Sequence, residues 1–178
     1  MPSVCRILCC GLLLVSFSCS GLAAQTKPIV QAPAGFDLKE AMNALFGNFD
    51  PKTGSSHSSI SQATASRLQD SWFKNGDEII VRPLRILEAQ EDGKHKSILV
   101  TFSVPKVNFD CHACRPFIGV VVFVRNGDRW EVESRGDMIT YSGGFGEPSR
   151  DFRVVHVGPG RIGIQMTDSD EGQGGQHS

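Results

Sequence analysis

The residues best suited to chemistry in this chain are Cys111, His112 and Cys114, which stand together in the sequence DCHAC. Two thiols at this spacing can act as a redox couple, supply half of a zinc site or close a structural disulfide ring. A redox dithiol needs a helix after its first cysteine to stabilise the thiolate, whereas Arg115, Pro116 and an apolar run follow here. Zinc commonly needs two cysteine pairs, and no second C-x-x-C occurs. The sequence therefore predicts a Cys111–Cys114 disulfide and no metal, with a thiol-redox or metal-binding role of this loop as the alternative.

Three side chains are candidates for contacting a partner. His112 stands at the tip of the predicted ring, where it is either simply exposed or in contact with a partner. Tyr141 and Phe145 belong to the Gly-rich stretch TYSGGFGEP, which no helix follows to bind a phosphate. This stretch predicts either a mobile connection or, as the sharper interpretation, a binding loop formed by His112, Tyr141 and Phe145.

Neither a catalytic residue nor a cofactor is predicted. The motifs G-x-S-x-G and H-E-x-x-H do not occur. Asp168 begins a stretch similar to a calcium loop, but Gly172 takes the place of a ligand. The chain has 18 basic and 19 acidic residues, so it lacks the basic surplus of a nucleic-acid-binding protein. These patterns favour a non-enzymatic protein over an enzyme without excluding an active site formed by residues distant in sequence.

The N-terminus has the features of a secretory signal, which we expect to comprise residues 1–24. Arg6 precedes an apolar run, and small residues ending at Ala24 follow. The run is shorter than the roughly 20 residues that span a bilayer, so no transmembrane segment is predicted. A lipoprotein anchored through Cys19 is the alternative. Cleavage after Ala24 leaves Cys111 and Cys114 as the only cysteines of a periplasmic or secreted protein, in a compartment that favours disulfides.

The remaining chain predicts one α+β domain at residues 36–167, after a flexible leader at 25–35 and before a disordered tail at 168–178. Apolar residues at helical spacing predict a helix after Phe36 and a second, shorter one over residues 62–72. From residue 77 the pattern alternates, with turns at EDGK, NG and GPG. We expect one or two N-terminal helices packed on a mostly antiparallel meander of about six strands. The residues predicted to be buried together are Leu45, Phe102, Val120, Val122 and Trp130.

Several stretches between Asp110 and Gly174 carry a resemblance: DCHACRPFIGVVVF, NGDRWEV, GGFGEPSRDFRVVHVGPGRIGI and EGQGG. In this order they resemble uncharacterised secreted proteins of Gram-negative bacteria. Those proteins have a Cys-His-x-Cys loop before an apolar strand, then a Trp strand, a Gly-Glu-Pro loop, a Gly-Pro turn and a Gln-Gly segment. The resemblance implies export but no known activity. In that family a further strand follows the Gln-Gly segment, so this chain, which stops at Ser178, is expected to lack it.

Two hypotheses about function follow. The first is an exported interaction protein, similar in role to an inhibitor or to an immunity protein that blocks a toxin, with another protein as its partner. The second is a redox or metal-binding protein that uses Cys111, His112 and Cys114. A readily reducible thiol of low pKa would favour the second.

Overall fold

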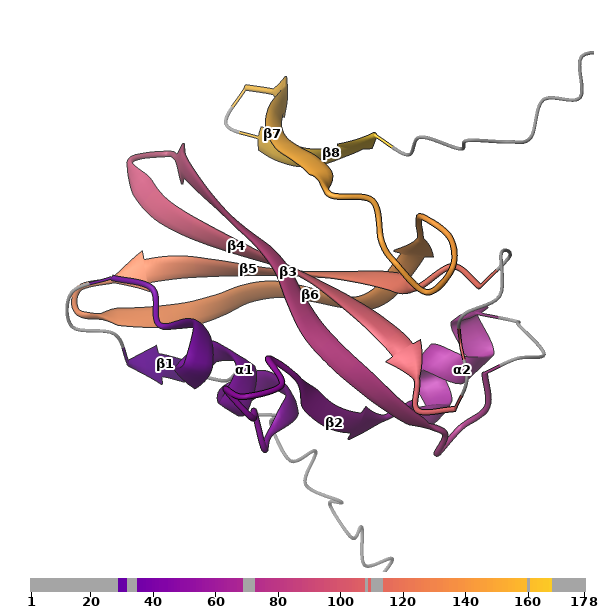
Figure 1. Cartoon of the computed structure of the whole chain (residues 1–178). Coiled ribbons are helices and arrows are strands. Elements are labelled where there is room, and N and C mark those ends of the chain that lie inside the picture. Colours follow the sequence, from indigo (N-terminus) through magenta and orange to yellow (C-terminus); the bar gives the residue numbers. More distant parts are fainter. Residues whose placement is uncertain are drawn as a thin grey trace, which may run out of the picture.

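The computed structural model describes residues 29–31, 35–68, 73–107, 109, 114–159 and 161–167. These residues form two helices and eight strands, and every pair of neighbouring strands is antiparallel (Figure 1). The predicted mostly antiparallel β-structure with helices is thereby confirmed. In chain order the elements are β1 (Ile29–Gln31), α1 (Leu38–Phe46), β2 (Ser56–Ser59), α2 (Gln62–Leu68), β3 (Glu78–Glu91), β4 (Lys94–Pro105), β5 (Phe117–Asn126), β6 (Arg129–Tyr141), β7 (Asp151–Gly158) and β8 (Arg161–Thr167).

Six strands form one sheet in the order β1-β6-β5-β4-β3-β2, and β7 and β8 form a second sheet. The strands β3 to β6 make a meander, as expected, but the prediction of one meander of about six strands is wrong because the last hairpin separates. Strand β1 comes from residues 25–35, which were expected to be a leader without structure. Figure 1 shows the β7–β8 hairpin on one side of the twisted main sheet and α1 and α2 on the other.

Helix α1 begins and ends as its sequence predicts. The Asp37 carboxylate accepts a hydrogen bond from the Glu40 N–H at 2.9 Å, which satisfies a donor that the first turn leaves free. Gly47 ends the helix with a φ of 68°, a conformation that glycine adopts at little cost. Helix α2 is described over Gln62–Leu68, and residues 69–72, the end of the predicted helix, lie outside the described residues, so its full length stays a prediction.

The central strand β4 is buried on both of its faces. On the helical side, Leu99 belongs to a cluster that contains the buried face of α1. On the hairpin side, Val100 and Phe102 pack in a second cluster with Phe152 of β7. Burial on both faces is the usual condition of a central strand that is covered from two sides.

The five residues predicted to share a core do not do so. Leu45 and Trp130 belong to the cluster on the helical side, and Phe102 belongs to the other. Val120 and Val122 are only half-buried and belong to neither cluster. Successive residues of a strand point to opposite faces, and the β7–β8 hairpin contacts β3 rather than the middle of β5.

An ion-pair network fixes the hairpin to the end of the main sheet. The Lys96 ammonium is paired with Glu91 and Glu133, although the Lys96 side chain is only 7% exposed. The other carboxylate oxygen of Glu91 accepts a hydrogen bond from the Ile162 N–H of β8 at 2.8 Å. The hydrogen bond from Lys96 and then that from Ile162 lower the pKa of Glu91 below its ordinary value. Burial lowers the pKa of Lys96, but its hydrogen bonds to Glu133 and Glu91 outweigh this and raise it.

Candidate functional site

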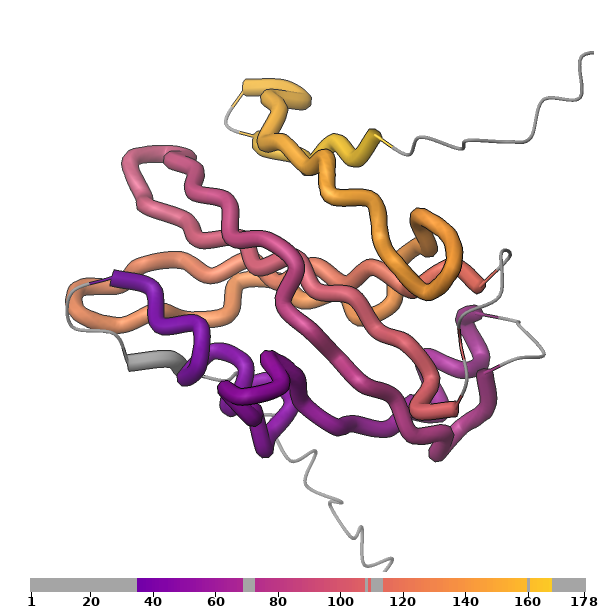
Figure 2. Tube along the Cα trace, viewed as in Figure 1, coloured from indigo at the N-terminus to yellow at the C-terminus, as the bar shows by residue number. Residues whose placement is uncertain are grey.

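Two segments that flank strands of the meander meet at one end of the main sheet. Phe117, the first residue of β5, is paired with Tyr141, the last residue of β6. Residues 114–116 therefore lie beside residues 142–147, and we call these two segments with Tyr141 the loop cluster. Figure 2 shows the trace leaving this end of the sheet and rising towards the β7–β8 hairpin. Hydrogen bonds join the segments, among them those from Ser142 N–H to Pro116 O at 3.1 Å, from Gly146 N–H to Cys114 O at 2.7 Å and from Arg115 Nε–H to Gly143 O at 3.1 Å.

A tight turn presents Phe145 at the surface of the loop cluster. Gly144 and Glu147 exchange two backbone hydrogen bonds, of 3.1 and 2.9 Å. The two central residues have positive φ, 53° at Phe145 and 75° at Gly146, which is the pattern of a type I′ turn. Gly146 is also required for space, because a Cβ there would lie 2.2 Å from the Phe109 carbonyl oxygen. Phe145, by contrast, is a bulky residue in a conformation that favours glycine and asparagine.

Tyr141 is held between an apolar and a charged neighbour. Its ring meets that of Phe117 edge-to-face at a centroid distance of 6.0 Å. The Arg115 guanidinium lies 5.0 Å from the Tyr141 ring centroid, within the range of a cation–π interaction. Tyr141 is nevertheless 51% exposed and Phe145 60% exposed. The structure thus brings Tyr141 and Phe145 to one end of the sheet.

Of the cysteine motif, only Cys114 is among the described residues, and it lies at the same end of the sheet. Cys114 is disulfide-bonded. Cys111 and His112 lie outside the described residues, so the Cys111–Cys114 pairing and the contacts of His112 stay predictions. Within the described part of the chain, no group of three or more His, Cys, Asp or Glu side chains is placed to hold a metal ion.

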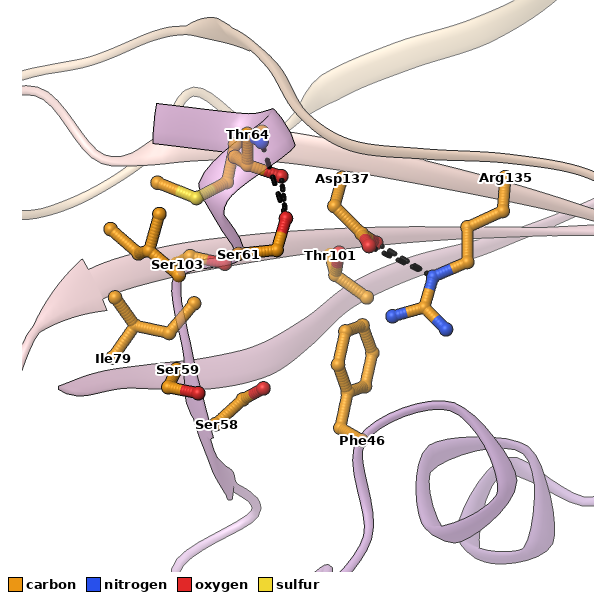
Figure 3. Close-up of a pocket in the computed structure, with 12 residues that line it drawn as sticks. Phe46, Ser58, Ser59, Ser61, Thr64, Ile79, Thr101, Ser103, Arg135 and Asp137 are labelled. Carbon is orange, nitrogen blue, oxygen red and sulfur yellow. Dashed lines mark hydrogen bonds and ion pairs between the residues drawn. The ribbon is translucent and has the colours of Figure 1, made fainter. Parts of the chain in front are cut away.

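A second site, which the sequence did not predict, lies between the two edges of the curled sheet. A cavity of about 170 Å³ has walls from β2, β3, β4 and β6 and from both helices, and we call it the seam pocket (Figure 3). Its lining residues are Phe46, Ser58, Ser59, Ile60, Ser61, Thr64, Ile79, Thr101, Ser103, Arg135, Asp137 and Met138. Half of these side chains carry a hydroxyl group.

A bulge in β6 shapes one wall of the seam pocket. The register of the β5–β6 pair shifts between Ile118 and Val120, so that residues 137–139 lie opposite Gly119 alone. Met138, at the centre of the bulge, has a φ of 53° and a side chain that is 2% exposed. A Cβ on Gly119 would lie 2.7 Å from Thr101 Oγ1, so the close approach of β4 and β5 at this point requires glycine.

Two arginines bridge the seam from β6 to the helices. Arg135 Nε–H donates to both carboxylate oxygens of Asp137 at 2.9 Å, as Figure 3 shows, and its Nη1–H donates to the Leu45 carbonyl of α1 at 3.1 Å. From α2, Arg67 donates to the backbone carbonyls of Met138, at 2.9 Å, and of Asp137. The seam is therefore held by side chains, where a closed barrel would have strand-to-strand hydrogen bonds.

Comparison with known proteins does not identify the chain, because no family model, curated protein or solved structure matches it. The resemblance to secreted Gram-negative proteins therefore stays a prediction. No helix in the described part of the chain is long and apolar enough to cross a membrane.

Proposed function

We propose that this chain is an exported binding protein without catalytic activity, and that it holds another protein through the loop cluster. The observation that carries the proposal is the conformation of Phe145. This aromatic side chain is 60% exposed and has a positive φ of 53°. A non-glycine residue in the left-handed region costs about 1–2 kcal/mol, and such strain is concentrated at functional sites.

The neighbours of Phe145 fit a protein partner better than a small ligand. Tyr141 and Arg115, which contact each other, belong to the same loop cluster, and aromatic residues and arginine are enriched in the central part of protein interfaces. The hydrogen bonds between residues 114–116 and 142–147 hold the segment in place before binding, which reduces the entropy lost on association. We include His112 in this surface, and we place the protein among inhibitor-like or immunity-like modules.

The test is a comparison of three forms of the mature protein in pull-downs from periplasmic extract. Phe145→Asn removes the aromatic ring and suits the left-handed conformation. Val157→Asn is the matched control, because Val157 is an exposed apolar residue on β7, away from the loop cluster, with 64% exposure. We expect a partner that wild type and Val157→Asn retain and Phe145→Asn loses. Equal capture by all three forms would refute the role of the loop cluster.

The proposal includes export and a structural disulfide. We propose cleavage after Ala24, with a lipid anchor at Cys19 as the alternative, and intact-mass measurement of the exported protein distinguishes the two. We also propose that Cys111 and Cys114 pair with each other and do not act as a redox couple. Thiol titration tests this, because two free thiols in protein purified from the periplasm, or disulfide exchange on a reduced substrate, would favour the redox alternative.

We further propose that α1 covers the main sheet permanently and takes no part in binding. Ala41 and Met42 are fully buried against the same cluster as Leu99 and Phe123. Amide hydrogen exchange in α1 as slow as in β4 is the expected result, since a helix that detaches would exchange faster than the strand beneath it.

A further inference from the structure

The seam pocket has the properties of a ligand site that is separate from the loop cluster. Its walls come from β2, β3, β4, β6 and both helices, so several of the elements that form it are distant in sequence. The volume of about 170 Å³ is below the roughly 300–1,000 Å³ typical of drug-sized ligands. The pocket therefore suits a molecule of only a few carbon atoms.

Two hydroxyl groups at the floor of the pocket lack protein partners. Thr101 and Ser103 lie on the central strand and are 2% and 5% exposed. Both side chains line the cavity, and among the described residues neither hydroxyl takes part in a hydrogen bond. Neither oxygen is among the buried side-chain atoms that lack both a partner and access to the cavity, so both hydroxyls open into the pocket and can bond to a molecule that enters it. Central strands rarely direct polar side chains inward unless something bonds to them.

The charges of the lining are already balanced. Among the described residues that line the pocket, Arg135 is the one basic and Asp137 the one acidic residue, and they are paired with each other at 2.9 Å. Arg135 is further engaged by the Leu45 carbonyl and by the Phe46 ring, 4.9 Å from its guanidinium carbon. An anion or a cation would have to break this pairing, so a neutral molecule fits best.

The rest of the lining combines hydroxyl groups with apolar surface. Ser58 and Ser59 of β2 and Thr64 of α2 add hydroxyls, whereas Ile60 and Ile79 present hydrocarbon. A hydroxyl can donate and accept in the same site, and its best counterpart is another group that does both. A polyol has such groups on one side of a short carbon chain and C–H bonds on the other.

We propose that the seam pocket binds a small neutral polyol of about four carbons, whose hydroxyl groups bond to Thr101 and Ser103. A protein segment is the less favoured occupant, because Arg67 already bonds to the carbonyls of Asp137 and Met138 along the open edge of β6. Binding at this site does not require the loop cluster.

The test uses erythritol as the probe in an amide ¹H–¹⁵N NMR titration of the mature protein. Butan-1-ol, with the same carbon count and one hydroxyl, and sodium acetate, an anion, are the comparison probes. We expect saturable shifts with erythritol at β4 and β2, and weaker binding of both comparison probes. Ser103→Ala should weaken erythritol binding roughly fivefold, the value of one hydrogen bond.

Two further variants make the outcome specific. Thr101→Val removes the second floor hydroxyl at nearly constant volume, and Ser134→Ala removes an exposed hydroxyl of β6 outside the pocket as the control. Ser103→Ala alone decides the matter if Thr101→Val fails to fold. Amide chemical shifts that rise linearly with erythritol concentration without saturation, or that are equal in Ser103→Ala and Ser134→Ala, would mean that erythritol binds as an adventitious additive only. Tighter binding of acetate, or protection of the pocket by a captured protein instead of erythritol, would also overturn the proposal.

Discussion

Adjacent valines of β5 allow a direct test of which face of the sheet carries the core. Val121 is fully buried in the cluster beneath α1, whereas Val122 points to the other face and is half-buried. We propose to replace each by alanine in the mature protein. The two variants lose the same two methyl groups from the same strand, so the loss of intrinsic strand preference is similar in both.

The expected free energies of unfolding differ because the surroundings differ. Two buried methyl groups are worth about 1.6 kcal/mol of transfer free energy, and the cavity left in a rigid core raises the cost of Val121→Ala to about 2.5 kcal/mol. Val122 loses about half the transfer term and leaves no closed cavity, so Val122→Ala should cost about 1 kcal/mol. The difference of about 1.5 kcal/mol corresponds to roughly 0.7 M in the urea midpoint for a slope of about 2 kcal/mol/M.

Urea unfolding followed by Trp fluorescence gives the measurement, because Trp130 is buried in the same cluster as Val121. The slopes of wild type and both variants must agree for the midpoints to be compared. Equal midpoints for the two variants, or a lower midpoint for Val122→Ala, would refute the assignment of the core to the helical face of β5.

Three other predictions follow from single contacts. Phe145→Asn should raise the free energy of unfolding by up to about 1 kcal/mol, because asparagine adopts the left-handed conformation with less strain, and it should also abolish partner binding. A lower melting temperature for this variant would show that the conformation of Phe145 is not strained. Glu91→Gln should destabilise the protein at neutral pH. Because folding lowers the pKa of Glu91, this carboxylate stabilises the fold above its ordinary pKa, and the stabilisation is lost as the pH falls through the folded value. The urea midpoints of the variant and the wild type should therefore converge in acid. Gly119→Ala should cost about 1–3 kcal/mol by forcing Thr101 away from β5, and a mutant with the wild-type melting temperature would contradict the close approach.

Local signals predicted the parts of the fold that depend on neighbours in sequence. Asp37 and Gly47 mark the ends of α1, where the structure has them. In the EDGK turn, Asp92 and Gly93 have φ of 49° and 72°, as a type I′ hairpin requires. Proline cannot donate a hydrogen bond within a sheet, which favours an edge or a bulge, and the β3–β4 register shifts next to Pro83. The free energy of each of these features depends on residues only a few positions apart, so the local sequence is enough to predict it.

The seam pocket was missed because its signal is non-local. The alternation of residues in β4 by itself indicates a strand with one buried face, which would leave Leu99, Thr101 and Ser103 on the exposed side. The structure buries both faces, since Leu99 belongs to the cluster on one side of the sheet and Val100 and Phe102 to the cluster on the other. A polar residue at every second position of a strand is expected both when that face of the strand points to solvent and when it points into an internal cavity. Once β4 is known to be central, Thr101 and Ser103 become the signal that points to a site.

The exposure of Tyr141 and Phe145 was predictable, whereas their arrangement was not. A Gly-rich connection with two aromatic residues was expected to display them, and the structure places both at the surface. The fixed geometry of the segment depends on hydrogen bonds to residues 114–116, more than 25 positions earlier in the chain. The positive φ of Phe145 also had no local signal, because glycine or asparagine would be expected there.

The arginine contacts across the seam have a consequence for how copies of this protein behave towards each other. A sheet that curls without closing leaves backbone donors and acceptors along its border, and such borders recruit strands from neighbouring molecules. Arg67 occupies the carbonyls of Asp137 and Met138, and the bulge turns the same stretch of β6 out of line. Replacing Arg67 by a shorter side chain would therefore leave the monomer's core untouched but favour ordered self-association at high concentration. We therefore expect the Arg67 guanidinium to keep copies of the protein from pairing through this border of the sheet.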